Sequence, residues 1–334
     1  MRNRKPWIRG LIFVCIAAAI LGVGLYLLNR YENAQYQSTR GDMTEGFGQL
    51  RTITVDGVRY REKPAVTTML LAGIDKEEAT ENVSQTSYRE GGQADFLMLL
   101  AIDHTDQKIY RFQIERDTMA EIDILGVFGN EVGTRTEQIC LAHSFGATPE
   151  DNAKYTMRAV ERLLGGLSID SYYMIDYTAM DDLADALGGI PVTVPDDMTS
   201  VNPAWTKGAR ITLTGSDAEL FVRSRLTIGS GTNEERMVRQ NEFMKNAIAT
   251  MNKKISADLS FGESLLDTLS DIAETNFTKK RLLEELNVAY NFEVLPVDHP
   301  AGEYAIGPEG FVEFHMQEGA AVEWVLNHLY TKVK

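Results

Sequence analysis

Two stretches decide the fold: FLMLLAID at residues 96–103 and KIYRFQIERD at residues 108–117. Each is short and apolar enough for a buried β-strand, and the four residues HTDQ between them fit a hairpin turn. The second strand runs directly into Glu115, Arg116 and Asp117. Three adjacent charges after a strand are most often a solvated turn. Their role therefore depends on what the rest of the chain places beside them.

Strand and helix patterns alternate on both sides of this pair. Upstream, TTMLLAGID (67–75) is a third buried strand. Downstream, Thr148 and Pro149 open a helix that Gly165 ends, and YYMIDY and IPVTV are strands separated by a short helix. Residues 233–251 form an amphipathic helix with a methionine stripe. The sequence predicts one α/β domain over 64–334, with a central mixed β-sheet flanked by helices.

The N-terminus predicts a membrane anchor. Residues 1–9 are a basic tail, and residues 10–28 include eighteen uncharged, mostly apolar residues from Leu11 to Leu28. As a helix these eighteen would reach about 27 Å, close to the hydrocarbon thickness of a bilayer. A cleaved signal peptide is the competing interpretation, but no small-residue cleavage site follows Leu28. We expect a single-pass signal-anchor with the N-terminus in the cytoplasm and the main domain outside.

Residues 29–63 are polar and predict a stalk between the anchor and the domain. A small hairpin is expected within it, turning at Asp56-Gly57.

Charge and cysteine content exclude several classes of function. The 28 basic and 48 acidic residues after position 30 give the outer part a formal charge of −20. Nucleic-acid binding needs a basic surface, so it is not expected. Cys15 lies in the expected anchor and Cys140 outside it, so the two cannot form a disulfide. The five scattered histidines show no zinc-ligand spacing.

Charged and amide side chains gather at the ends of predicted elements. Carboxylate oxygens suit Mg²⁺, and arginine forks bind phosphate oxygens in pairs. No catalytic serine, cysteine or histidine signature accompanies them, so the pattern indicates a phosphate group handled through a divalent ion. Each cluster alone would be a surface salt bridge worth about 0–1 kcal/mol. The clusters are Asp95 before one strand, Arg116 and Asp117 after another, Arg223 and Arg225 at i, i+2, and Arg236, Arg239 and Gln240 on one face of the long helix, away from the methionine stripe. If the FVRSR segment is extended, Arg223 and Arg225 point to one side as two parallel forks.

Six motifs follow one another along the chain: MLLAGID, ADFLMLLAID, IERDT, YYMIDYTAMDDLADALGGIPVTV, LTGSDAELFVRSR and RMVRQ. In this order they resemble the LytR–CpsA–Psr family of bacterial cell-envelope proteins. The resemblance covers about residues 65–250 and implies a polyprenyl-pyrophosphate-linked glycopolymer as substrate, Mg²⁺ as cofactor and peptidoglycan as acceptor. It implies transfer of the phosphoglycopolymer with release of polyprenyl phosphate. The family has also been labelled a transcriptional attenuator.

The resemblance carries roles to individual residues. Asp95 matches the aspartate of the family's R-S-D motif, and Arg116 and Asp117 match its P-R-D motif. Arg116 would then bind the pyrophosphate while Asp95 and Asp117 hold the metal, which makes Arg116 and Asp117 the expected catalytic pair. The remaining expected pyrophosphate-binding or lipid-binding residues match the R-x-R pair and the helix signature, and are Arg223, Arg225, Arg236 and Gln240.

Several positions depart from the family pattern. Two positive charges and one carboxylate of the pattern are missing, and each charge-assisted hydrogen bond to phosphate is worth about 1.5–3 kcal/mol. Asn233 would also serve as a helix N-cap, as aspartate would. The departures are Gln93 for arginine, Ala94 for serine, Glu115 for proline, Gln138, Cys140 and His143 where K-I-N-x-A-Y is common, and Asn233 for aspartate.

Two functions of different classes remain open. The first is a Mg²⁺-dependent phosphotransferase acting on a lipid-linked glycopolymer. The second is a non-catalytic, membrane-anchored module that binds lipid-linked envelope precursors. The departures at Gln93 and Gln138 favour the second, and the presence of Asp95 and Asp117 favours the first. The glycopolymer, the acceptor sugar and the oligomeric state have no signal in the sequence.

Overall fold

The computed structural model describes residues 51–76, 91–126, 131–177, 179–224, 233–258 and 292–333, with short pieces between 227 and 278. The expected anchor, the first part of the stalk and Arg225 lie outside these residues. Within the part of the chain that is described, no helix is long and apolar enough to span a membrane.

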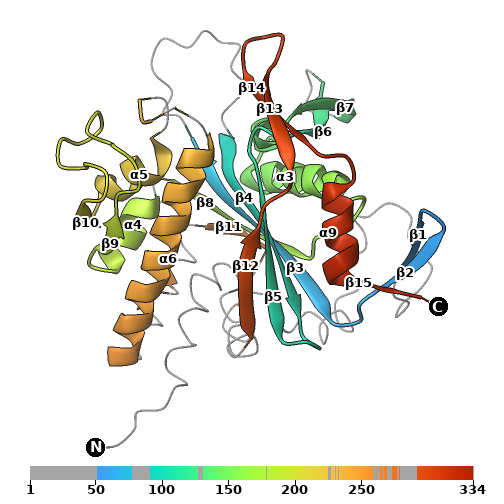
Figure 1. Ribbon diagram of the computed structural model, residues 1–334, viewed down its shortest axis with the longest axis horizontal. Coiled ribbons are helices and arrows are strands. Elements are labelled where there is room, and N and C mark those ends of the chain that lie inside the picture. Colours follow the sequence, from blue (N-terminus) through green and yellow to red (C-terminus); the bar gives the residue numbers. More distant parts are fainter. Residues whose placement is uncertain are drawn as a thin grey trace, which may run out of the picture.

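A six-stranded mixed sheet forms the centre of the domain, in the order β11-β8-β3-β4-β5-β12 (Figure 1). Strand β4 runs antiparallel to β3 and β5, while β8 is parallel to β3 and β12 is parallel to β5. The predicted mixed sheet and the hairpin at HTDQ are therefore confirmed. The strands are β3 (Val66–Asp75), β4 (Gln93–Asp103), β5 (Lys108–Ile114), β8 (Ser171–Asp176), β11 (Ala273–Thr275) and β12 (Glu293–Asp298).

Both faces of the sheet are buried, which explains why its strands are continuous apolar runs. Successive side chains of a strand point to opposite faces. Leu70 and Leu99 therefore enter one hydrophobic core, while Met69 and Leu100 enter the other.

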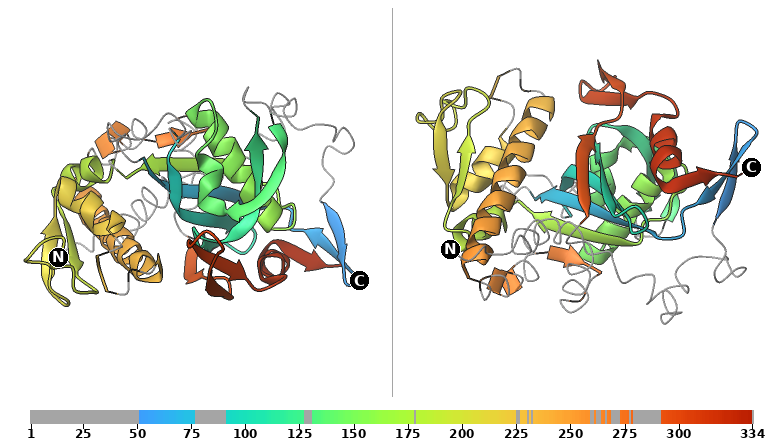
Figure 2. Two further views of the ribbon diagram at one scale, coloured as in Figure 1. Left: turned by 90° about the horizontal axis from the view of Figure 1, so that it is seen from above. Right: turned by 60° about the horizontal axis from the view of Figure 1, so that its bottom comes forward.

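Helices cover both faces, as Figures 1 and 2 show. One core packs against α4, α5 and α6, and the other against α3 and α9. Thr148 caps α3 as predicted, its hydroxyl accepting from the Asp151 amide at 3.1 Å. The helices are α3 (Pro149–Leu163), α4 (Ala179–Ala186), α5 (Ser216–Arg223), α6 (Asn233–Ala257) and α9 (Ala320–Leu329), with a short 3-10 helix, η3 (Ile139–His143).

Smaller sheets surround the centre. The predicted turn at Asp56-Gly57 is present, with φ values of 50° and 77° that a two-residue hairpin loop requires. Its second strand also pairs with the C-terminal strand, so this end of the expected stalk is part of the folded domain. These strands are β1 (Thr52–Val55), β2 (Val58–Glu62) and β15 (Tyr330–Lys332); the other pairs are β6 (Met119–Leu125) with β7 (Glu131–Gln138), β9 (Ile190–Thr193) with β10 (Arg210–Leu213), and β13 (Gly302–Ile306) with β14 (Val312–Met316).

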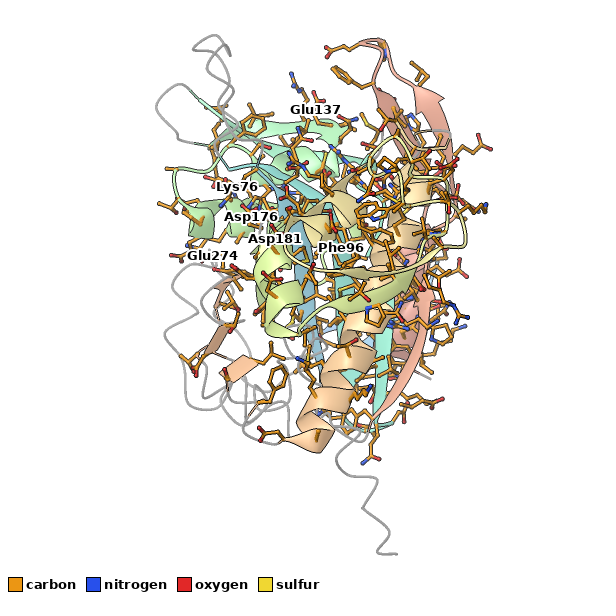
Figure 3. The ribbon with its side chains drawn as sticks, turned by 90° about the vertical axis from the view of Figure 1, so that its left-hand side faces the viewer. Lys76, Phe96, Glu137, Asp176, Asp181 and Glu274 are labelled. Atoms are coloured by element: carbon orange, nitrogen blue, oxygen red, sulfur yellow. The ribbon has the colours of Figure 1, made fainter. Side chains whose placement is uncertain are left out.

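One end of the central sheet collects the charged positions. Because β4 is antiparallel to both neighbours, it begins where β3 and β5 end: Asp75 pairs with Gln93, and Ile114 with Leu97. The parallel strand β8 ends here too, and Figure 3 shows Lys76 beside Asp176, 3.6 Å apart. Residues far apart in the sequence therefore meet at this edge.

Candidate functional site

Arg116 links the two carboxylates that the sequence predicts as metal ligands. Its guanidinium reaches from the end of β5 to β4, where Nη1 lies 2.8 Å from Asp95 Oδ1. Its Nε lies 3.3 Å from Asp117 Oδ1. Asp95 and Asp117 are each only 3% exposed. The structure thus brings together Asp95, Arg116 and Asp117, although they come from two strands.

Arg236 joins this cluster from the first turn of α6. Its Nη1 donates to Asp95 Oδ2 and its Nη2 to Asn233 Oδ1. Arg236 is 2% exposed, so Asp95 is held between two buried guanidinium groups. Removing one partner of such a buried pair leaves an uncompensated charge, which costs about 3–5 kcal/mol.

Two of the departures from the family pattern bind Arg116. Its Nη2 donates to Gln93 Oε1 and to Cys140 Sγ, the latter at 3.1 Å. Burial raises the pKa of the Cys140 thiol to about 11, so the sulfur is a neutral acceptor. Gln93 and Cys140 therefore orient the guanidinium without adding charge.

Two further departures, Glu115 and Asn233, bind each other. Asn233 Nδ2 donates to Glu115 Oε1, and both residues are buried. Burial, with the nearby charge of Asp117, raises the pKa of Glu115 to about 7. Asn233 is the first residue of α6, and its side chain is occupied by Glu115 and Arg236.

The C-terminal hairpin β13–β14 closes one side of the site, and no sequence pattern predicted this. The amide of Phe314 donates to the Asp117 carbonyl at 2.8 Å. Gln138 Nε2 donates to the Val312 carbonyl at 2.7 Å and lies 3.5 Å from Asp117 Oδ1. Burial, together with the nearby Glu115 carboxylate, raises the pKa of Tyr304. These hairpin residues follow the motif-bearing region by some 60 positions, so local spacing carries no signal for them.

Arg223 differs from its expected geometry. An extended FVRSR segment would point Arg223 and Arg225 to one side, but Arg223 is the last residue of helix α5. Helix-forming residues 216–222 continue through it, so the expectation of two parallel forks is wrong for Arg223. Its Nη2 lies 2.7 Å from Asp75 Oδ1 and its Nη1 donates to Glu219 Oε1 at 2.9 Å. Arg225 lies outside the described residues.

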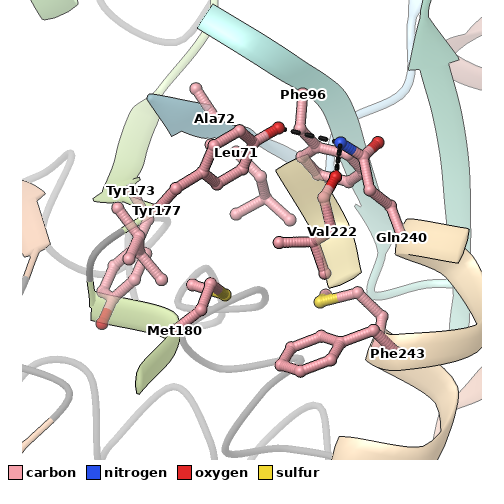
Figure 4. Close-up of a pocket in the computed structure, with 12 residues that line it drawn as sticks. Leu71, Ala72, Phe96, Tyr173, Tyr177, Met180, Val222, Gln240 and Phe243 are labelled. Carbon is pink, nitrogen blue, oxygen red and sulfur yellow. Dashed lines mark hydrogen bonds between the residues drawn. The ribbon is translucent and has the colours of Figure 1, made fainter. Parts of the chain in front are cut away.

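The polar residues of α6 do not lie on a separate face from its methionines. Arg239 is fully buried and binds the carbonyls of Phe221 and Ser224 at the end of α5. Gln240 donates to the Tyr177 hydroxyl at 2.8 Å, as Figure 4 shows. At 100° per residue, Gln240 and Met244 are neighbours on the helix. The expected separation from the methionine stripe is therefore wrong, because one buried face carries both sets.

An apolar pocket opens beside the charged cluster, between the sheet and α4–α6 (Figure 4). Its cavity volume is about 70 Å³, enough for a short apolar segment of a longer ligand. Phe96 follows Asp95 directly on β4, and Gln240 lies one turn after Arg236 on α6, so strand and helix carry both regions. The lining includes Leu71, Gly73, Phe96, Tyr177, Met180 and Met244.

His143 also departs from the family pattern, but its side chain takes no part in the charged cluster. Its Nδ1 lies 3.1 Å from Thr156 Oγ1, on the face of the sheet covered by α3. Burial, with a smaller effect of Lys76, lowers its pKa to about 3. His143 is therefore neutral in the folded protein.

This burial predicts a pH dependence of stability. Unfolding returns His143 to a pKa of about 6.5. The part of the free energy of unfolding that comes from the neutral ring is therefore complete above pH 6.5, and it is lost as the pH falls toward 3. We expect His143→Gln to remove a slope of up to about 1.4 kcal/mol per pH unit in the free energy of unfolding. Urea unfolding between pH 4 and 8 measures it, with exposed His315→Gln as control. Equal slopes in parent and His143→Gln would contradict the prediction.

The balance of charge at the site bears on metal binding. Three guanidinium groups, of Arg116, Arg223 and Arg236, face the carboxylates of Asp75, Asp95, Glu115, Asp117 and Glu219. Carboxylates therefore outnumber guanidinium groups among the described residues of the site.

The donor set fits Mg²⁺ in kind, because it offers carboxylate oxygens, of which Asp95 Oδ1 is paired with Arg116 Nη1 at 2.8 Å. Among described residues no three carboxylate, histidine or cysteine side chains are grouped as metal ligands. Asp95 and Asp117 would thus supply a minority of the six ligands, leaving the others to water and phosphate, as Mg²⁺ commonly binds.

Comparisons with known proteins agree with this architecture. The model of the LytR_cpsA_psr family matches residues 27–293. The polyisoprenyl-teichoic acid–peptidoglycan teichoic acid transferase TagU of Halalkalibacterium halodurans is 27% identical over 80% of this chain and 78% of its own. The crystal structure of Bacillus subtilis TagV superposes with a TM-score of 0.58 at 21% identity, over 79% of this chain and 97% of that one. A structure of TagT bound to LI-WTA superposes with a TM-score of 0.56 at 19% identity, over 79% of this chain and 90% of that one.

Proposed function

Because the chain belongs to the LytR–CpsA–Psr family, we propose that it transfers a phosphoglycopolymer from a polyprenyl-pyrophosphate carrier to peptidoglycan. Relatives carry the name of polyisoprenyl-teichoic acid–peptidoglycan teichoic acid transferases, which supports this class of reaction. The proposal includes an N-terminal membrane anchor that keeps the domain outside the cell and close to the lipid carrier.

One observation carries the proposal: the charged cluster and the apolar pocket lie side by side on β4 and α6. A polyprenyl pyrophosphate has a charged head joined to a long apolar tail. The cluster around Arg116 and Arg236 suits the head, and the pocket around Phe96 and Met244 suits the first part of the tail. A free sugar phosphate would need the first region only.

The reaction follows from this placement. An acceptor hydroxyl oxygen bonds to the phosphorus that carries the glycopolymer, and the bond from that phosphorus to the bridging oxygen breaks. The electron pair stays on polyprenyl phosphate, and the hydroxyl proton passes to a carboxylate of the cluster. Arg116 and Arg236 stabilise the charge that develops on the phosphate oxygens, since fixed donors act most strongly in a water-poor site.

Mg²⁺ belongs to the proposal because carboxylates outnumber guanidinium groups in the part of the site that the structure describes. A pyrophosphate adds negative charge to a cluster in which carboxylates already outnumber guanidinium groups. Asp95 and Asp117 would hold the ion, which would neutralise phosphate charge and orient the leaving group.

Removing one of these carboxylates predicts a loss of metal affinity that depends on the substrate. We expect Asp117→Asn to lower the Mg²⁺ affinity at least tenfold when a polyprenyl pyrophosphate is bound, because an amide oxygen is a weaker ligand. Without the lipid, both proteins should bind Mg²⁺ weakly. Calorimetry measures this, and equal affinities with lipid present would show that Asp117 is not a ligand.

The function itself is tested with the full chain reconstituted in bilayer nanodiscs. Given Mg²⁺ and a polyprenyl pyrophosphate, we expect release of phosphate, water replacing the glycan acceptor. EDTA should abolish it. Tight lipid binding without any release, even with peptidoglycan fragments added, would instead support the accessory module. The full pairing of Arg116, Arg223 and Arg236 with internal carboxylates is the observation that favours this second candidate.

A further inference from the structure

We propose that Glu115 and Asn233 form a relay that positions Arg236 for binding the pyrophosphate. This inference rests on the proposed function and adds two positioning residues to it. Neither residue touches the expected reacting atoms; both act through Arg236.

The contacts form one continuous chain across the site. Asn233 Nδ2 donates to Glu115 Oε1, and Asn233 Oδ1 accepts from Arg236 Nη2. The other end of the guanidinium donates from Nη1 to Asp95 Oδ2. Glu115, Asn233 and Arg236 are each at most 3% exposed, so water does not compete for these bonds.

An amide is the group that this position requires. It must donate to a carboxylate and accept from a guanidinium at once, and a neutral amide carries one donor group and one acceptor. Aspartate can accept from Arg236 but cannot donate to Glu115. The family pattern has proline at the position of Glu115, and an aspartate at position 233 would then face no carboxylate from that position. The two departures thus compensate each other chemically.

The relay leaves the Nε donor of Arg236 available. With Nη1 and Nη2 bound, the plane of the guanidinium is fixed, although the arginine side chain carries about 2 kcal/mol of rotamer entropy when free. Its Nε is buried and makes no hydrogen bond. A buried donor without an acceptor is costly in a folded protein. A ligand oxygen is the partner that this arrangement predicts.

The hairpin β13–β14 holds the far end of the relay. The Phe314 amide donates to the Asp117 carbonyl at 2.8 Å, and Tyr304 of the same hairpin lies near enough to the Glu115 carboxylate that this charge, after burial, raises the pKa of Tyr304. Glu115 therefore ties the end of β5, the start of α6 and the C-terminal hairpin into one unit. A shift of Glu115 would be passed to Arg236 through Asn233.

An exchange of carboxylate and amide tests the relay. Asn233→Asp places two carboxylates in contact and should weaken binding of polyprenyl pyrophosphate, with Mg²⁺, at least tenfold in the full chain. In the double variant Glu115→Gln, Asn233→Asp the amide stands at position 115 and the carboxylate at position 233, so a donor again faces an acceptor. Its affinity for polyprenyl pyrophosphate should be within about threefold of the parent value. Asn246→Asp is the matched control, because Asn246 also donates to a carboxylate of α6, that of Glu242, but does not contact Arg236.

Unfolding of these four proteins and of Glu115→Gln alone, without ligand, gives a second readout, because additivity is judged from both single variants. The unfolding equilibrium constant of the double variant should be at least tenfold smaller than that of Asn233→Asp alone. The summed effects of the two single substitutions on unfolding would not give this value. The inference is overturned if Asn233→Asp binds as the parent does, or if the double variant regains stability but not affinity. If the parent binds no polyprenyl pyrophosphate, the proposed function fails, and additive unfolding effects would then overturn the relay as well.

Discussion

Replacing Arg116 by lysine is expected to reduce Mg²⁺-dependent phosphate release about 100- to 1,000-fold, the usual effect of losing one preorganised donor to a developing oxyanion. Lysine keeps the positive charge between Asp95 and Asp117. It cannot reproduce a planar fork that contacts both carboxylates, Gln93 and Cys140 at once. The ammonium should therefore bind one carboxylate and leave the phosphate-binding geometry undefined. Initial rates at saturating lipid measure the effect.

The control for this prediction is Arg162→Lys. Arg162 also pairs with a buried aspartate, Asp123, at 2.7 Å, but it lies on α3, away from the site. Both variants should melt within a few degrees of each other, since each retains one ion pair. If Arg116→Lys turned over as fast as Arg162→Lys, Arg116 would not be a catalytic residue. If both lost activity together, the effect would be one of folding.

Adding a single methyl group at Gly73 is expected to weaken binding of the polyprenyl tail at least tenfold. A Cβ at this position would lie 2.7 Å from Tyr177 Cε1 and 3.1 Å from Phe96 Cβ. The Tyr177 ring must move, and it carries the hydroxyl that binds Gln240 in the wall of the pocket. Excluding even two methylenes from an apolar site costs about 1.6 kcal/mol. Titration of Gly73→Ala with a polyprenyl pyrophosphate measures the change.

Inorganic pyrophosphate is the control ligand for Gly73→Ala. It occupies only the charged cluster, so its affinity in the presence of Mg²⁺ should stay within about twofold of the parent value. Equal losses of affinity for the lipid and for inorganic pyrophosphate would mean that Gly73→Ala disturbs the charged cluster. No loss for the lipid would place the tail elsewhere.

Local patterns predicted most of the elements correctly. Apolar runs of six to nine residues without helical period indicated strands buried on both faces, and β3, β4, β5 and β8 are such strands. The Thr148-Pro149 pair located the start of α3, and Asp56-Gly57 located a tight turn. These predictions succeed because backbone preference and burial act over a few neighbouring residues. The geometry of Arg223 was wrong because i, i+2 spacing says nothing until the backbone conformation is known.

The sequence by itself determined which charged residues are available and that they lie at element ends; it also determined the family. Tertiary structure alone decided their partners: that Arg116 bridges Asp95 and Asp117, that Asn233 joins Glu115 to Arg236, and that a hairpin about 190 residues after Glu115 supplies Tyr304. The physical reason is range. Propensity and periodicity are set by neighbours along the chain, whereas a hydrogen bond requires two atoms within about 3 Å of each other. That distance is fixed only once the sheet order and the packing of α6 bring distant segments together.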